Sequence, residues 1–178
     1  MASTSWKNGA MRFLWPDYYA AGNSHTARTV GIAWIQQKVF RRNAHVPWPV
    51  HPTTVVRAPE RILRGTRTPG LAVGCYIDGR NGIEIGPNVW IGPYTRLISM
   101  NHSTDDHTKY EICEPIRIER DCWIAAGATI LPGVHMGRHT VVAAGAAVTR
   151  SFPEGDQVLV GIPARVLKRL PPYGSGRE

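Results

Sequence analysis

Cysteine is scarce in this sequence, and long apolar runs are missing from it. Among 178 residues there are three cysteines, Cys75, Cys113 and Cys122, and none belongs to a CxxC pair. Three thiols cannot all pair with one another, so we expect them to be reduced and partly buried. Such thiols favour a cytoplasmic location.

The apolar segments near the start are short. The opening stretch "MASTSWKNGAMRF" lacks the continuous apolar core of a signal peptide. The segment "TVGIAWIQQKVF" is interrupted by glutamine and is too short to span a bilayer. The sequence therefore predicts neither a signal peptide nor a membrane span.

Acidic residues are also few. Thirteen Asp and Glu stand against 21 Lys and Arg, which gives a formal net charge of +8. This excess attracts anions, whether nucleic acid, anionic lipid or a phosphorylated cofactor. The basic residues are scattered and form no recognisable nucleic-acid motif, so we expect no nucleic-acid partner.

Glycine and proline, by contrast, are abundant, at 18 and 14 residues. They indicate frequent corners between short elements rather than long helices. Hydrophobic residues make up 43% and charged residues 19%, as in a soluble globular protein. The length favours a single domain with a sizeable core.

A six-residue period organises the middle of the chain. From Val73 the hexads are VGCYID, GRNGIE, IGPNVW, IGPYTR and LISMNH; from Ile112 they resume as ICEPIR, IERDCW, IAAGAT, ILPGVH, MGRHTV, VAAGAA and VTRSFP. Their first position is aliphatic or Met in eleven of the twelve hexads. A fixed short period predicts a solenoid of short parallel strands joined by tight bends, a β-helix. The alternative, ordinary strands in a sandwich, does not explain the period.

Several motifs resemble the hexapeptide-repeat acyltransferases, and most closely the sugar and lipopolysaccharide-type O-acetyltransferases. These are "PWPVHPTT", "GCYIDGRNGIEIG", "NH" at Asn101–His102, "CWIAAGATILPGV" and "VGIPARVLKRL", which together span roughly Pro47 to Leu170. The resemblance implies a mainly β fold, a left-handed parallel β-helix shaped as a triangular prism, and a homotrimer with its sites between subunits. It also implies acetyl-CoA as co-substrate and no required metal.

The expected organisation has three parts: a partly helical capping segment at 1–70, the β-helix at 71–153, and a C-terminal helix and tail at 154–178. A helix capped by Asn23 or Ser24 and reaching about Arg42 would place Val30, Trp34 and Val39 on one face. After Pro163, "ARVLKRL" predicts a short basic helix, and the tail "PPYGSGRE" is typical of disorder.

The period fails at residues 103–111, and this interruption follows His102 directly. A solenoid tolerates a loop at a corner, and such loops commonly carry function. Transfer of an acyl group to a hydroxyl needs a base, and imidazole suits neutral pH. By the resemblance, His102 is the catalytic base. Asn101 is a candidate for binding the acceptor, and Asp105 or Asp106 for orienting the histidine.

Small residues recur eighteen positions apart, at Ala125-Ala126-Gly127 and Ala143-Ala144-Gly145. If the hexad at 112 follows the one at 97, these segments stack on the face that carries His102. In the resembled family the pantetheine arm of coenzyme A lies along such a track, so Ala125, Ala126 and Ala144 are cofactor-binding candidates. The N–H groups near Ala125 and Ala126 are candidates for holding the thioester carbonyl. Trp123 resembles a tryptophan near the acyl donor and is a substrate-binding candidate.

Basic residues should meet the phosphates of coenzyme A. Arg150, which follows a threonine, and Arg165 and Lys168 of "GIPARVLK" resemble the phosphate contacts of the family. For each of them, a solvated surface charge is an equal alternative.

Two alternatives belong to other classes. A zinc enzyme similar to the γ-class carbonic anhydrases would use His102, His107 and a third histidine, for which His135 and His139 are poorly placed. A non-catalytic binding solenoid would use the basic surface alone. For the transferase, the acceptor stays open between a glycan-like sugar and a small natural product or antibiotic, as do amine in place of hydroxyl and a longer acyl group.

Overall fold

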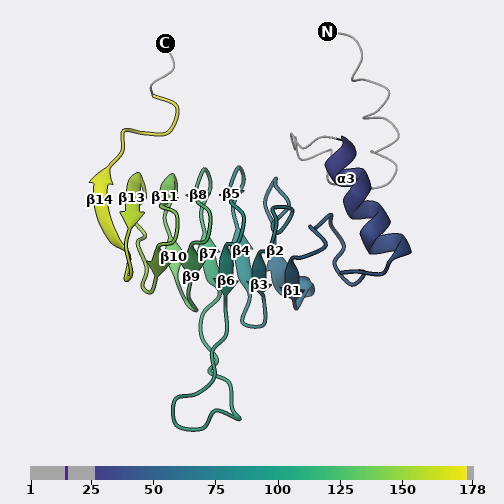
Figure 1. The fold of residues 1–178 in the computed structure, drawn as a ribbon. Coiled ribbons are helices and arrows are strands. Elements are labelled where there is room, and N and C mark those ends of the chain that lie inside the picture. The colour runs from purple at the N-terminus through teal and green to yellow at the C-terminus, as the bar shows by residue number, and fades with distance from the viewer. Residues whose placement is uncertain (1–14, 16–26, 176–178) are drawn as a thin grey trace.

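A computed structural model places the chain in a column of short strands wound around one core (Figure 1). The structure describes residue 15 and residues 27–175. Successive strands belong to different sheets, and strands one turn apart pair in parallel. This arrangement confirms the predicted β-helix and fits the left-handed triangular prism.

Three sheets form the faces of the prism. The first sheet holds β1 (Val55–Arg57), β3 (Tyr76–Asp78), β6 (Arg96–Ile98), β9 (Thr129–Ile130) and β12 (Ala147–Val148). The second holds β2 (Ile62–Leu63), β4 (Ile83–Ile85), β7 (Ile116–Ile118) and β10 (His135–Met136), with a 3-10 turn at Pro59–Arg61 before it. The third holds β5 (Trp90–Ile91), β8 (Trp123–Ile124), β11 (Thr140–Val142), β13 (Gln157–Val160) and β14 (Arg165–Arg169).

Each corner of the prism joins two of these sheets. The first corner leads from the first sheet to the second, the second corner from the second to the third, and the third corner back to the first. Because every coil passes the corners in this order, residues at one corner of successive coils stack along one edge of the prism. This stacking decides which candidate residues can meet.

Aliphatic side chains from all three sheets fill the prism. In the first sheet Ile77, Leu97 and Ile130 occupy the same register on successive strands, and each is fully buried. Ile116 and Met136 of the second sheet and Ile124 and Leu159 of the third are buried in the same core. Burying one such side chain contributes about 1.5–3 kcal/mol. The hexad period therefore marks the residues whose side chains point into the core of the prism.

The prism begins earlier than residue 71. Strand β1 already pairs with β3, and β2 with β4, in parallel. Val46, Trp48 and Val50 are buried in the same core cluster and close this end of the prism. The predicted boundary between capping segment and β-helix is thus too late, because the first coil has few residues that match the hexad pattern.

The N-terminal helix is shorter than predicted on the side that the structure describes. Helix α3 (Ala27–Trp34) gives way to a π-helix, Ile35–Val39. Val30 is buried beside Leu71, whereas Val39 is 60% exposed, so Val39 does not share the packed face. The wider π turn shifts the residues after Trp34 around the helix axis. The predicted cap at Asn23 or Ser24 lies outside the described residues.

The interruption is longer than 103–111. Strand β6 ends at Ile98 and β7 begins at Ile116, and Ile112 is 92% exposed rather than inside the core. The hexads therefore resume in register at Ile118, which pairs with Ile85. As a result, the hexad at 124 stacks on that at 91 in the third sheet, not on the hexad at 97. The predicted face assignment is wrong for this reason.

The predicted C-terminal helix is a strand. β14 pairs antiparallel with β13 and covers the last open edge of the third sheet. A helix would leave the backbone groups of that edge without partners from the sheet, which is costly. The chain turns at Gly161, whose φ of +94° is readily adopted by glycine. In the described part of the tail that was expected to be disordered, residues 171–175, Tyr173 packs edge-on against His139.

Burial of the thiols predicts their reactivity. All three cysteines are free, and Cys75 and Cys122 are buried while Cys113 is half-buried. Burial raises the pKa of the Cys122 thiol to about 12 and raises that of Cys75. Because thiolate is the reactive form, very little of Cys122 is reactive at pH 8.

We therefore expect iodoacetamide at pH 8 to modify Cys113 in the folded protein and to leave Cys75 and Cys122 intact. Peptide mass spectrometry over a time course measures this directly, and the denatured protein serves as control because all three sites should then react. Modification of Cys122 as fast as Cys113 would contradict the burial described above.

Candidate active site

The interruption forms a long hairpin-like arm at the first corner. Figure 1 shows it projecting from the side of the prism opposite the turns of β5, β8 and β11. The Glu111 N–H donates to the Asn101 carbonyl (3.0 Å), and the Ser103 N–H donates to the Lys109 carbonyl (2.9 Å). His102 and Tyr110 face each other as an antiparallel bridge between these bonds. The base of the arm is therefore ordered by its own backbone.

Asn81 ties this arm to the coil beneath it. Its side-chain amide donates to the Glu111 carbonyl (2.9 Å) and lies 3.2 Å from the Cys113 sulfur. Its backbone N–H donates to the Ser99 hydroxyl (2.9 Å). Both ends of the arm are thus fixed to one residue of the preceding coil, which gives His102 a defined position relative to the prism.

The imidazole of His102 is held in one tautomer. Its Nδ1 lies 2.6 Å from the backbone carbonyl oxygen of His107. A carbonyl oxygen can only accept a hydrogen bond, so Nδ1 carries a proton, and in the neutral ring Nε2 carries the lone pair. The ring is exposed to solvent. An exposed Nε2 with an available lone pair has the form that a general base requires.

Among residues 15 and 27–175, no carboxylate is hydrogen-bonded to this histidine. Asp106 accepts hydrogen bonds from the hydroxyl and N–H of Thr108 and pairs with Lys109 at 3.2 Å. These bonds, led by that from the Thr108 hydroxyl, lower the pKa of Asp106. The Asp105 N–H donates to the Ser103 hydroxyl. Both aspartates take part in hydrogen bonds within the turn of the arm. The backbone carbonyl of His107, and not a carboxylate, bonds to the His102 ring and orients it.

Sequence reasoning missed the aromatic neighbour of His102. The Tyr110 ring lies 4.5 Å from the imidazole between centroids, at 35° between planes. The Arg80 guanidinium carbon lies 4.7 Å from the centroid of the same tyrosine. The hydrophobic pattern did not indicate Tyr110, because this residue lies in the interruption of the hexads. Only the separation of eight residues between His102 and Tyr110, on either side of the turn, could have indicated that the two rings meet.

The small-residue segments stack as predicted, but along a different edge. The Gly145 N–H donates to the Ala126 carbonyl and the Ala125 N–H to the Val142 carbonyl, both at 2.9 Å. Ala126 and Ala144 are exposed. This stripe runs along the third corner, so the first sheet separates it from the arm. The Ala125 N–H is already engaged, which leaves that of Ala126 as the thioester candidate of the two.

Trp123 lies on the outer face of the third sheet. It stands between Trp90 and Val141 on neighbouring strands, and the three line a hollow of about 500 Å³ together with Asp121, His139 and Tyr173. The arm leaves the prism between the other two sheets. One protomer therefore does not bring His102 and Trp123 together, whereas Asn101 lies directly beside His102 in the arm.

The three basic candidates lie toward the C-terminal end of the prism at two different edges. Arg150 follows β12 at the first corner, two coils beyond the arm, with its guanidinium 4.9 Å from the Phe152 ring centroid. Arg165 opens β14 just after the third corner and donates to the Ala164 carbonyl at 3.0 Å. Lys168 lies further along the same exposed strand.

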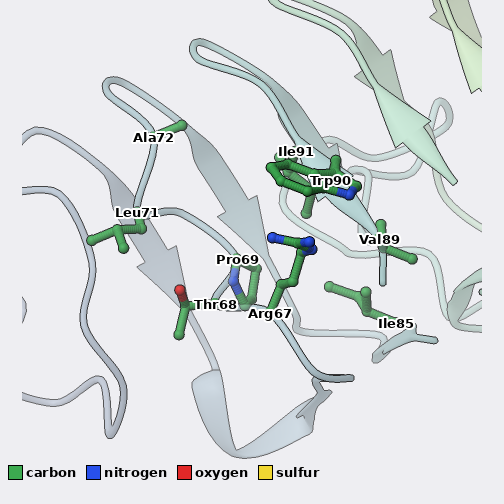
Figure 2. A pocket seen from close by; sticks show the side chains of 9 residues that line it. All are labelled: Arg67, Thr68, Pro69, Leu71, Ala72, Ile85, Val89, Trp90 and Ile91. Carbon is green, nitrogen blue, oxygen red and sulfur yellow. The ribbon is translucent and has the colours of Figure 1, made fainter. Parts of the chain in front are cut away.

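A second, smaller pocket lies on the other side of Trp90. Figure 2 shows the Arg67 guanidinium beneath the indole of Trp90, and its carbon is 3.3 Å from the ring centroid. Arg67 also donates to the Asn88 side-chain oxygen at 3.2 Å. The cavity measures about 60 Å³, which suits water and not an acyl or sugar group. The contacts that Arg67 makes with the indole and with Asn88 hold Trp90 in place.

The two histidines judged poorly placed as a third zinc ligand have other partners. His135 pairs with Glu119 at 2.9 Å on the second sheet, and His139 pairs with Asp156 at 3.0 Å beside the third. Within residues 15 and 27–175, no three His, Cys, Asp or Glu side chains gather in a way that could hold a metal. No helix in that same part of the chain is both long and apolar enough to cross a membrane.

Known proteins match this chain on its repeats. The sequence model of the bacterial transferase hexapeptide family (six repeats) matches residues 115–150. A galactoside O-acetyltransferase of Lactococcus lactis is 32% identical over 90 residues, which cover 51% of this chain and 42% of the relative. Nodulation protein L of Rhizobium meliloti is 41% identical over 95 residues, 52% of this chain and 51% of its own. The chain thus spans about half the length of the curated relatives it matches.

A solved structure extends the likeness over nearly the whole chain. A hexapeptide-repeat acetyltransferase from Vibrio cholerae, complexed with acetyl coenzyme A, aligns with 96% of this chain and 91% of its own. The TM-score is 0.53 and the sequence identity 26%.

Proposed function

Since the chain is a hexapeptide-repeat β-helix protein similar to acetyltransferases, we propose that it is an acyl-CoA-dependent O-acyltransferase. The acyl group is acetyl from acetyl-CoA, and the acceptor is a hydroxyl of a sugar or glycan-like molecule. The observation that carries the proposal is His102, whose Nδ1 donates to a backbone carbonyl and whose Nε2 stays available as a base.

The chemistry follows from that tautomer. His102 Nε2 takes the proton of the acceptor hydroxyl while the oxygen attacks the thioester carbonyl carbon. The resulting imidazolium then gives this proton to the departing thiolate as the carbon–sulfur bond breaks. The Ala126 N–H is the candidate donor to the oxyanion formed in between. Asn101, beside the base, would bind the acceptor.

A homotrimer completes the site in this proposal. Within one protomer the arm lies at the first corner, while Trp123 and the stripe of Ala126 and Ala144 belong to the third sheet and the third corner. If the arm of one subunit reaches the third sheet of its neighbour, His102 meets the acyl donor and acceptor there. The three free thiols support a cytoplasmic location.

Transfer of labelled acetyl groups tests the function. Purified protein is incubated with radiolabelled acetyl-CoA and a panel of methyl galactosides, maltose, glucosamine and chloramphenicol, and the acetylated position is located by mass spectrometry. We expect label on a sugar hydroxyl; label on nitrogen would make the enzyme an N-acyltransferase instead. Absence of acetyl-CoA binding in calorimetry would contradict the proposal whatever the acceptor.

Charge reversal at Arg150 tests the phosphate contact. Arg150→Glu replaces an attraction to the phosphates of acetyl-CoA by a repulsion, so we expect the KM for acetyl-CoA to rise about tenfold with kcat little changed. Arg120→Glu is the matched control, because Arg120 is exposed at the second corner, away from the arm and the stripe. An equal KM for Arg150→Glu and wild type would remove Arg150 from the site.

A further inference from the structure

One hydrogen bond does not fix the His102 ring completely. The bond from Nδ1 to the His107 carbonyl sets the tautomer, but the ring can still rotate about the axis of that bond. Its exposed position offers little packing against this rotation. The Tyr110 ring lies over one face of the imidazole at 4.5 Å and 35°, which restricts the rotation. Tyr110 is therefore placed to limit the directions in which Nε2 can point.

Tyr110 is itself held from the prism. The Arg80 guanidinium carbon lies 4.7 Å from the tyrosine centroid, within the range of a cation–π contact. Arg80 belongs to the coil beneath the arm, in the segment between β3 and β4. The aromatic pair is thus attached to a rigid coil and not only to its own loop.

A buried carboxylate fixes Arg80 in turn. Asp78 is 1% exposed, and its two oxygens accept from Arg80 Nε at 2.9 Å and Nη2 at 2.7 Å. This bidentate arrangement sets the plane of the guanidinium as well as its position. Hydrogen bonding to Asp78 also raises the pKa of Arg80, so its charge is retained at every pH of interest.

We propose that Tyr110 is a positioning residue for His102, and that Asp78 and Arg80 hold its ring in place. The proposal rests on the proposed acyltransferase function for its effect on rate, while the placement of the ring stands independently. The ring of Tyr110 is what matters in this arrangement, because the stacking with His102 and the contact with Arg80 both use its π face. The Tyr110 hydroxyl also interacts with Arg80, but the stacking on His102 does not use it.

Two substitutions at one position separate these roles. Tyr110→Phe keeps the ring, and Tyr110→Leu removes it while filling similar space at a half-exposed site. We expect Tyr110→Leu to lower kcat about tenfold or more, because a misaligned base is costly, with the KM for acetyl-CoA changed less than about twofold. Tyr110→Phe should stay within about threefold of wild type in both constants. Equal losses in the two variants would overturn the proposal.

Histidine NMR provides a readout that does not need turnover. Long-range proton–nitrogen spectra identify the His102 ring as the signal missing from His102→Gln. We expect wild type and Tyr110→Phe to show protonated Nδ1 and ring protons shifted upfield by the stacked aromatic ring. Tyr110→Leu should lose the upfield shift, and Arg80→Lys, which keeps the charge but not the planar fork, should weaken it. An unchanged His102 signal in Tyr110→Leu would overturn the placement.

Kinetics and histidine NMR together distinguish a failure of the proposed function from a failure of the positioning role of Tyr110. A wild-type protein that binds and transfers no acyl group, yet shows the expected ring shift and its loss in Tyr110→Leu, would contradict the proposed function and leave the ring placement standing. Normal turnover in wild type with undiminished kcat in Tyr110→Leu would contradict the positioning role alone.

Discussion

Replacement of His102 by glutamine is expected to lower kcat for acetyl transfer by about a hundred- to ten-thousandfold, the usual contribution of a general base. Glutamine has no lone pair basic enough to take the acceptor proton, although it is similar in polarity. The KM for acetyl-CoA should change little, because no donor contact is assigned to the imidazole. Steady-state kinetics with the acceptor found in the transfer panel measures both constants.

His135→Gln is the control for this substitution. His135 is also a solvent-accessible histidine, but it lies in β10 on the second sheet and pairs with Glu119. Its replacement should leave kcat within about twofold of wild type. Undiminished turnover in a folded His102→Gln protein would eliminate the base and, with it, the mechanism proposed above.

Substitution of Gly137 by alanine is expected to destabilise the fold by about 3 kcal/mol, the upper end for overpacking. Gly137 follows β10 at the second corner, where a Cβ would lie 2.6 Å from the Gly155 nitrogen and closer still to the Pro153 carbonyl oxygen. Both neighbours are backbone atoms of the next coil, so they cannot move without separating two coils. Guanidinium unfolding at a fixed protein concentration measures the loss.

Gly145→Ala separates crowding from backbone strain. Gly145 has a φ of +70°, and an added methyl group would meet nothing within 4 Å, so its substitution costs only the left-handed conformation, about 1–2 kcal/mol. Gly137 has no positive φ, and its cost comes from contact alone. A smaller loss for Gly137→Ala than for Gly145→Ala would show that adjacent coils are less closely packed than described.

The hexad period predicted the prism because it reports the core directly. Every first position from Ile118 to Val148 is buried, as a solenoid requires. The period gave a wrong position for Ile112, because the sequence alone does not distinguish an isoleucine on an exposed arm from one inside the core. Because Ile112 was counted as the start of a hexad, every later hexad was assigned to the face next to its true one. The stripe of small residues was therefore predicted on the wrong edge.

The candidate site was predictable in part. His102 could be singled out because it precedes a break in a regular pattern. Its orienting partner could not, because the backbone carbonyl of His107 has no signature in the side-chain sequence. Tyr110 and Arg80 come from different coils, so their meeting depends on the register of the arm, which the polar interruption did not specify. The roles assigned to Asn101, Trp123 and the basic residues stay predictions.

The final strand also limits how copies of this protein can associate. A parallel β-helix with a bare end offers a template on which another molecule could extend the same sheet, coil upon coil, into a fibre. Here β14 runs against the direction of β13 and carries Arg165, Lys168 and Arg169, so the last coil presents a reversed and positively charged edge. Growth along the long axis is thereby discouraged. In the proposed trimer, the subunits would therefore meet along the flat sides of the prism.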